Sequence, residues 1–251
     1  MAIDSHMHIN SVVIDNLRDE ISLINNNPYI DSVINVGLNY QTSCESILIS
    51  SNNSKFYSSV GIHPLYIEKE NIDSLYGLIP NDKVVAIGEI GLDILGNNLE
   101  KQKRYFVEQI KIANYFNLPV IIHSNNMSKE IINIFENTIK PEFGCVFHCF
   151  QPEMDILKYL IENNYYISFA GKITYKNAKK SIDVIKEVPN NLFLVETDSP
   201  YMSPEPYRDS INHSSNISYI INRISDVKGI RCEEVEILTS ENTKRLFKKI
   251  K

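Results

Sequence analysis

Near its N-terminus the chain reads Ile3-Asp4-Ser5-His6-Met7-His8, in which two histidines are separated by one residue. Alternate side chains of a β-strand point the same way, so His6 and His8 would present both imidazoles to one side at the end of a strand. Such a pair can hold one metal ion, with bonds of about 2.0–2.1 Å in the case of zinc. Two unrelated surface histidines could have the same spacing, so further metal-ligating residues elsewhere in the chain are needed to support a metal site.

Short apolar runs rich in β-branched residues recur along the chain and predict eight strands. They cover residues 2–4, 32–36, 56–60, 84–87, 119–122, 145–147, 165–168 and 192–195. Near-continuous hydrophobicity is typical of parallel strands that are covered on both faces.

Segments with helical spacing separate these runs. The clearest covers residues 99–117, where Phe106, Ile110, Ala113 and Phe116 recur every three or four positions. The others cover residues 16–24, 42–49, 127–139, 154–162, 178–188, 217–227 and 240–250. An α/β alternation repeated eight times predicts a single (β/α)8 TIM barrel over residues 1–251. A doubly wound open sheet is the competing fold, but it often has a Gly-rich first turn, and residues 5–10 contain no glycine.

Composition limits the class of protein. With 25 Lys and Arg against 31 Asp and Glu, the formal charge of −6 argues against a generally basic nucleic-acid coat. We find no apolar run near the roughly 18 residues that span a bilayer, and no signal-peptide pattern at the N-terminus. The four cysteines form no CxxC pair and favour reduced thiols. We therefore expect a cytoplasmic, monomeric protein with no membrane partner.

Metal-ligating side chains gather at the ends of the predicted strands. Five of the six histidines follow a strand there, and the acidic residues Glu89, Asp93, Glu196 and Asp198 do the same. The five are His6, His8, His63, His123 and His148, while the sixth, His213, lies in the loop after the last strand. In a barrel these strand ends meet at the face that carries the active site, so the pattern predicts a metal centre.

The ligand set suits two divalent ions. His6, His8 and Asp198 can hold one ion, His123 and His148 a second, and Glu89 can bridge the two. Two divalent ions (+4) and two carboxylates (−2) leave a centre of about +2, which attracts an anion and can clamp both oxygens of a phosphoryl displacement.

The chain resembles the TatD-type metal-dependent DNases of the amidohydrolase-like TIM-barrel superfamily. The matching stretches are residues 60–64, 86–93, 118–124, 148–150, 168–178 and 195–201. The resemblance implies that His6, His8, Glu89, His123, His148 and Asp198 bind two divalent ions, which would be Mg, Mn or Zn. It places His63 near the metals, where it could help hold a third ion. Asp93 could meet that ion or orient a ligand, and Glu196 fits a position behind the ligands.

Departures from the family's pattern fall where a substrate would be contacted. Asn125 and Asn126 stand where an Arg is common, and Gln151-Pro152 follows His148-Cys149-Phe150. Cys149 should point away from His148 into the core, as the next residue of a strand. The candidates for substrate binding are Lys172, Lys176, Arg208 and His213.

The leading hypothesis is a metal-dependent deoxyribonuclease that hydrolyses phosphodiester bonds. It would act as a 3′-to-5′ exonuclease on single-stranded or frayed DNA ends, with Asp198 as general base toward a metal-activated water. Two alternatives stay open: an amidohydrolase-type hydrolase of a small ester or amide, and a metal-bound interaction protein without catalysis. The first would often place a modified lysine after the fourth strand, where this chain has Glu89.

Overall fold

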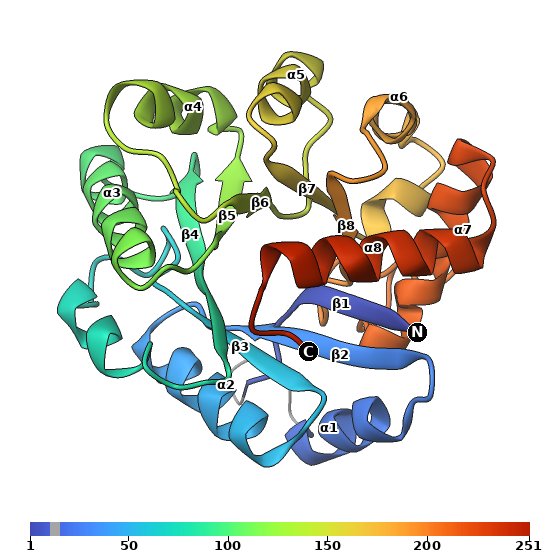
Figure 1. Ribbon diagram of the computed structural model, residues 1–251, viewed down its shortest axis with the longest axis horizontal. Helices are drawn as coiled ribbons and strands as arrows, with labels where there is room; N and C mark the ends of the chain where they lie inside the picture. The colour runs from blue at the N-terminus through green and yellow to red at the C-terminus, as the bar shows by residue number, and fades with distance from the viewer. Residues whose placement is uncertain (11–15) are drawn as a thin grey trace.

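The computed structural model describes residues 1–10 and 16–251. Eight parallel strands pair in chain order and form a nearly closed barrel (Figure 1). They are β1 (Ala2–Met7), β2 (Ile30–Val36), β3 (Phe56–Val60), β4 (Val84–Asp93), β5 (Val120–Asn125), β6 (Cys145–Phe147), β7 (Tyr166–Phe169) and β8 (Phe193–Val195). Each predicted run lies on one of these strands, so the predicted barrel is confirmed.

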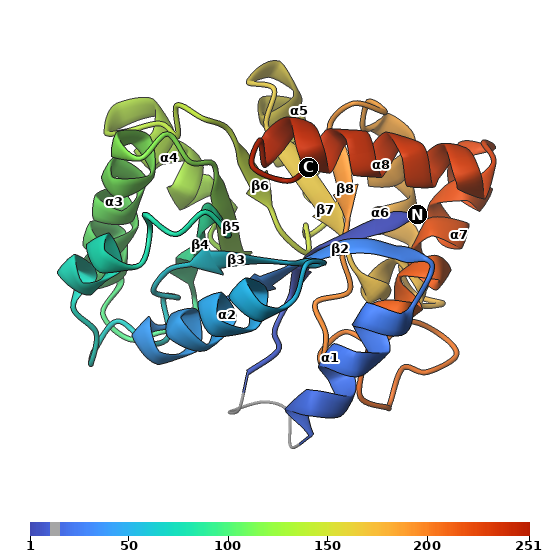
Figure 2. The ribbon, with the colours of Figure 1, turned by 60° about the horizontal axis from the view of Figure 1, so that its bottom comes forward.

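Helices surround the strands on the outside of the barrel (Figure 1). They are α1 (Leu17–Asn26), α2 (Tyr40–Asn52), α3 (Leu99–Tyr115), α4 (Ser128–Asn137), α5 (Met154–Glu162), α6 (Lys179–Glu187), α7 (Ile217–Lys228) and α8 (Cys232–Leu246), with 3-10 helices η1 (Ile72–Gly77), η2 (Gly171–Thr174) and η3 (Ser214–Asn216). Helix α8 crosses the end of the barrel at which both chain termini lie (Figures 1 and 2). Among the described residues, no helix is long and apolar enough to cross a membrane.

The connection between β3 and β4 departs from a regular strand–helix alternation. It contains the six-residue helix η1 in place of a full α-helix. Pro64 and Pro80 lie on either side of η1, and proline disrupts the interior of a helix because it lacks an N–H and clashes with the preceding turn.

Helix α8 begins at Cys232, eight residues before the start predicted from the sequence. Its first turns bury Val235 and Thr239, followed by Thr243. The hydroxyl of Thr239 donates to the Val235 carbonyl at 2.8 Å, and that of Thr243 donates to the Thr239 carbonyl at 2.7 Å. Because threonines form much of this buried face, apolar residues do not recur there with clear helical spacing. The start predicted from the sequence is therefore too late.

The barrel closes at a seam between β1 and residues 195–199. The Asp198 N–H donates to the His6 carbonyl at 2.9 Å, and the His8 N–H donates to the Ser199 carbonyl at 2.7 Å. Below them, the buried Asp4 carboxyl accepts from the Thr197 N–H at 2.9 Å and lies 2.6 Å from the Thr197 hydroxyl and 2.7 Å from that of Ser214. Side chains thus connect β1 to the chain that follows β8.

Two buried glutamines connect α3 to the ends of β3 and β4. The Gln109 amide accepts from the Ile62 N–H at 2.7 Å and donates to the Ile62 carbonyl at 3.1 Å. The Gln102 amide does the same with Asp93, at 2.9 and 3.2 Å. Each amide satisfies a backbone donor and acceptor as a neighbouring strand would. Helix α3 therefore positions the residues beside His63 and Asp93 itself.

Candidate metal centre

The first group of possible ligands, His6, His8 and Asp198, lies at the seam and is called the seam cluster below. His6 Nε2 lies 3.1 Å from His8 Nε2, and Asp198 Oδ1 lies 3.4 Å from His8 Nε2 and 3.8 Å from His6 Nε2. All three side chains are buried. The fold brings together the three residues that the sequence assigned to one ion.

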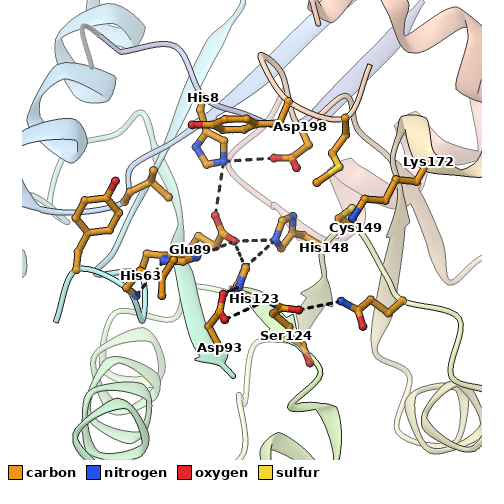
Figure 3. Close-up of a pocket in the computed structure, with 17 residues that line it drawn as sticks. His8, His63, Glu89, Asp93, His123, Ser124, His148, Cys149, Lys172 and Asp198 are labelled. Carbon is orange, nitrogen blue, oxygen red and sulfur yellow. Dashed lines mark hydrogen bonds and ion pairs between the residues drawn. The ribbon is translucent and has the colours of Figure 1, made fainter. Parts of the chain in front are cut away.

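The second group, called the β4–β6 cluster, consists of Glu89, His123 and His148. Glu89 Oε1 lies 2.6 Å from His123 Nδ1 and 2.7 Å from His148 Nε2. The other carboxylate oxygen, Oε2, faces the seam cluster at 3.5 Å from His6 Nε2 and 3.6 Å from His8 Nε2. Glu89 therefore stands between the two clusters with one oxygen toward each, as a bridging ligand would (Figure 3).

Further contacts orient the histidines. His8 Nδ1 lies 3.0 Å from the Val36 carbonyl, which can only accept, so Nδ1 carries a proton and Nε2 faces the cluster. His123 Nε2 lies 2.9 Å from Asp93 Oδ2, which leaves Nδ1 for the cluster. His148 Nδ1 lies 3.4 Å from Glu196 Oε1, a longer ion-pair contact. Such outer partners fix the ring and its tautomer in metal sites.

Glu196 is almost fully buried behind the clusters. Besides His148, it accepts from the Cys149 N–H at 2.7 Å and from the hydroxyl of Ser168. The structure thus places both Asp93 and Glu196 where they contact histidines of the β4–β6 cluster from outside.

His63 lies at the edge of the β4–β6 cluster. Its Nε2 is 3.7 Å from Glu89 Oε1, and its ring meets the His123 ring edge-on at 4.3 Å. Burial lowers the pKa of His63 to about 3, so the ring is neutral at ordinary pH. His63, Glu89 and His123 form a third set of atoms close enough to share an ion.

An irregularity in β4 aims Glu89 into the barrel. The register between β4 and β5 shifts between Ile87 and Ile90, and such irregularities turn side chains beside active sites. Gly91, two residues after Glu89, has φ +152°, and a Cβ there would lie 1.9 Å from the His123 carbonyl oxygen. Only glycine allows β4 to pass so close to β5, which explains the Gly-Glu-Ile-Gly sequence around Glu89.

The two carboxylates of the clusters are ionised. Burial alone would raise the pKa of Glu89, but His148, His63 and His123 hold it well below its usual range. Burial would also raise the pKa of Asp198, but the hydrogen bond from His8 and the nearby His148 and His6 lower it. Burial lowers the pKa of His6, whereas the carboxylates that face His8, His123 and His148 raise the pKa of those rings in spite of burial. The centre therefore pairs anionic oxygens with histidines that would release protons when they bind a cation.

This donor set fits divalent metal ions. Two atoms bonded to one ion at about 2.1 Å lie roughly 3.0–3.4 Å apart, depending on the coordination angle. The contacts from His8 Nε2 to His6 Nε2 and Asp198 Oδ1, at 3.1 and 3.4 Å, fall in this range, as does the 3.4 Å between His123 Nδ1 and His148 Nε2. Buried, oriented histidines that face carboxylates are the ligands that transition metals take in proteins.

The clusters form the floor of a pocket of about 340 Å³. The lining includes His63 and every residue of the two clusters except His6. The other lining residues are Leu38, Leu65, Tyr66, Asp93, Ser124, Asn125, Cys149, Gln151, Lys172, Tyr201 and Met202. Lys172 lies on the opposite side of Glu89 from His63 (Figure 3). It is the one lysine or arginine among the described lining residues.

The other three candidates for substrate binding lie outside this lining within the described part of the chain. The Arg208 guanidinium lies over the Tyr175 ring at 4.3 Å, and His213 Nδ1 lies 2.7 Å from Glu20 Oε2. Lys176 is exposed. Of the four, the structure brings Lys172 alone to the pocket wall.

Sequence reasoning misplaced one lining residue and overlooked several others. Cys149 faces the pocket and not the core, because β6 ends at Phe147 and the positive φ of Cys149 (43°) breaks the alternation of a strand. Burial raises the pKa of its thiol to about 12, so it stays protonated. Tyr66 and Tyr201 were overlooked, although each follows a ligand candidate by three residues.

Comparison with known proteins agrees with this geometry. The family model described as "TatD related DNase" matches residues 3–248. The chain belongs to this family. The TatD-type resemblance read from the sequence motifs is thereby confirmed.

Relatives share the whole barrel with this member of the TatD-related family. The chain is 32% identical over 253 residues to the uncharacterized metal-dependent hydrolase YabD of Bacillus subtilis, covering 99% of both proteins. It is 33% identical over 252 residues to an uncharacterized metal-dependent hydrolase of Buchnera aphidicola, covering 98% of this chain and 95% of the relative. Among solved structures, the TatD homolog YJJV from Escherichia coli matches with a TM-score of 0.90 and 25% identity, over 98% of each chain. The protein is a metal-dependent hydrolase of the TatD family.

Proposed function

We propose that this protein is a deoxyribonuclease that uses two divalent ions to remove nucleotides from the 3′ end of single-stranded or frayed DNA. The observation that carries the proposal is the position of Glu89, with one carboxylate oxygen toward each cluster on the floor of an open pocket. A shared carboxylate between two ligand sets is suited to holding two ions close together, and such pairs serve phosphodiester hydrolysis.

The distances support one division of the residues between the two ions. The seam cluster would hold one ion, His123 and His148 the other, and Glu89 would bridge them, while His63 stands at the edge. When bound, such ions act as Lewis acids that polarise a phosphoryl oxygen, make water a better nucleophile and neutralise charge on the leaving oxygen. The donor set suits Mg, Mn or Zn. Because it is rich in histidines, it favours the transition metals over Mg.

Asp198 is assigned the role of general base. Its Oδ1 lies beside His8 Nε2, its carboxyl is ionised, and it lines the pocket. An ionised carboxylate in this position can accept a proton from the attacking water as the water's oxygen forms its bond to phosphorus. The His8 contact and the backbone hydrogen bond to His6 keep Asp198 in place for that step.

The pocket favours an end over an internal stretch of duplex. Binding of duplex DNA depends on many contacts between phosphates and Lys or Arg, whereas Lys172 is the lysine or arginine that the described lining offers. A volume of about 340 Å³ is at the small end of ligand sites, enough for about one nucleotide. The positive charge for binding a phosphate would come mainly from the two ions.

A hydrolase of small esters or amides is the second candidate. The apolar part of the lining, with Leu38, Leu65 and Met202, would also accept an apolar acyl group. An assay on small ester and amide substrates run beside the DNA assay separates the two candidates.

The test compares linear and circular single-stranded DNA of the same length, each incubated with Mg²⁺, Mn²⁺ or Zn²⁺. We expect the linear strand to shorten from its 3′ end and the circle to persist. Labels at the 5′ and 3′ ends report the direction of shortening. Equal degradation of both forms would rule out trimming from an end, and no degradation of either, with turnover of a small ester or amide, would favour the second candidate. Binding without any turnover would favour the interaction protein.

A further inference from the structure

Two tyrosines, Tyr66 and Tyr201, stand in the pocket wall next to the metal centre. The Tyr201 ring lies 6.0 Å from the His8 ring at an interplanar angle of 64°, and the Tyr66 ring lies 6.2 Å from the His63 ring at 74°. Neither ring stacks flat on its histidine, and the two residues remain 45% and 40% exposed. Both rings are thus available to a molecule that enters the pocket.

The backbone holds each tyrosine at a fixed offset from a residue of the centre. The Tyr66 N–H donates to the His63 carbonyl at 2.9 Å, and the Tyr201 N–H donates to the Asp198 carbonyl at 2.9 Å. Each hydrogen bond closes a four-residue turn that contains a proline, Pro64 in one and Pro200 in the other. Proline restricts the backbone of such a turn. Pro64 is the second residue of its turn and Pro200 the third, so two loops from distant parts of the chain each place a ring beside the centre through a turn of its own.

The lining also carries polar side chains. They include Ser124, Asn125, Gln151 and Lys172, and Gln151 Nε2 donates to Asn125 Oδ1 at 3.4 Å. A nucleotide has the same division, with an apolar π-face on the base and a charged, hydrogen-bonding sugar-phosphate. Aromatic side chains stack on bases of any sequence, since every base has a π-face.

We propose that Tyr66 and Tyr201 form a nucleobase subsite that binds the base of a nucleotide flanking the bond to be cut. This inference rests on the proposed DNase function and names how that function recognises its substrate. The subsite also explains how the protein can bind DNA with a single lysine or arginine among the described lining residues. Base stacking would replace part of the binding energy that phosphate contacts otherwise provide.

The experiment compares single-stranded oligonucleotides that differ only in one base. One substrate is fully base-bearing, a second carries an abasic tetrahydrofuran residue at the 3′ terminus, and a third carries it at the next position. The measured quantity is kcat/KM for release of the first residue, with the ion that supports the highest activity. For the wild type, we expect about a 5- to 150-fold lower value with one of the two abasic substrates, the range that base–aromatic stacking produces.

Variants then assign the difference to the tyrosines. In Tyr66→Ala, Tyr201→Ala and the double variant, we expect the ratio between base-bearing and abasic substrates to fall toward one, while cleavage of the abasic substrate is kept. Tyr66→Phe and Tyr201→Phe keep the ring and should keep the ratio. Tyr76→Ala is the matched control, since Tyr76 is 46% exposed, packs on the Phe116 ring at 5.9 Å and lies outside the described lining.

The outcomes separate this inference from the proposed function. A wild type that trims base-bearing and abasic ends equally well would refute the subsite and leave the DNase proposal standing. Alanine variants that slow both substrates by the same factor would show that the rings only support His63 and His8, which also refutes it. A wild type that degrades no DNA with any ion would remove both proposals. The wild-type comparison needs no variant, so a misfolded variant does not block the test.

Discussion

The two ligand clusters are built in different ways, although they face the same carboxylate. The β4–β6 cluster comes from three neighbouring strands that pair directly with one another, and carboxylates contact its histidines from outside, Asp93 at His123 and Glu196 at His148. The seam cluster joins the first strand to the chain after the last one, is fully buried, and orients His8 with the Val36 carbonyl. The carboxylate partners make the histidines of the β4–β6 cluster more basic ligands, while the seam cluster depends on how well the barrel closes.

The largest expected effect is on turnover at the seam cluster. In Asp198→Asn, the proposed general base is lost while the side chain keeps its shape, so we expect kcat to fall by about 10²- to 10⁴-fold. Steady-state kinetics on labelled single-stranded DNA, with metal content measured in parallel, tests this. Asp209→Asn, an exposed aspartate on the following loop, should leave kcat unchanged. Wild-type turnover in Asp198→Asn would overturn the assignment of the base.

The difference in outer partners predicts unequal effects on the two ions. Asp93→Asn removes the carboxylate that contacts His123 Nε2, and outer partners of this kind change metal affinity by about 10- to 100-fold. We expect the weakened ion to be the one at the β4–β6 cluster, with the seam ion unaffected. Calorimetric titration of the metal-free protein resolves the two binding events. Glu187→Gln, on the exposed face of α6, is the control, and equal weakening of both ions would contradict the comparison.

Asp4 allows the seam to be tested through stability. Asp4→Ala removes the acceptor of four buried donors and should lower the free energy of unfolding by about 1–3 kcal/mol in urea denaturation. Asp31→Ala removes a partly exposed ion pair with Lys244 and should cost at most about 1 kcal/mol. A smaller loss in Asp4→Ala than in the control would show that side chains do not hold the seam.

The same residue predicts a pH dependence of stability in the metal-free protein. Burial raises the pKa of Asp4 from 3.8 to about 7, so the folded state binds a proton that the unfolded state has released. The stabilisation is complete below about pH 4 and is lost as pH rises through about 7. Asp4→Asn resembles the protonated form, and we expect it to flatten this part of the wild-type profile. An unchanged slope in Asp4→Asn between pH 4 and 7 would place the titration elsewhere.

The smallest effect is expected at the pocket rim. For single strands, each phosphate contact contributes about 0.7 to the slope of log K against log salt, and two or three contacts would give a shallow dependence. Lys172→Ala should reduce that slope by about 0.7, as measured by fluorescence anisotropy with a labelled oligonucleotide. Lys158→Ala, exposed on α5, should not change it. An unchanged slope in Lys172→Ala would exclude a phosphate contact by Lys172.

The parts of the centre that could be predicted from sequence follow from the parallel strands themselves. His6, His8, His123 and His148 come at or just past the ends of apolar runs, and those ends must meet at one face of a barrel. Local backbone geometry was harder to foresee. The turn at Cys149 depends on where β6 ends, and the early start of α8 depends on threonines that bury their hydroxyls against the helix backbone. Tyr66 and Tyr201 each follow a ligand candidate by three residues, but it takes the folded turns to show that both line the pocket.

The paired glutamines of α3 bear on how this fold can diversify. Gln102 hydrogen-bonds to Asp93, and Gln109, seven residues later in α3, hydrogen-bonds to Ile62. Two turns of one helix therefore hold the ends of two strands. Residues 94–98, between β4 and α3, add only backbone hydrogen bonds to this arrangement, because the N–H groups of Leu95 and Gly96 donate to Asp93. The side chains of Ile94 and Leu95 are exposed, so substitutions there can accumulate while the backbone that holds Asp93 is preserved.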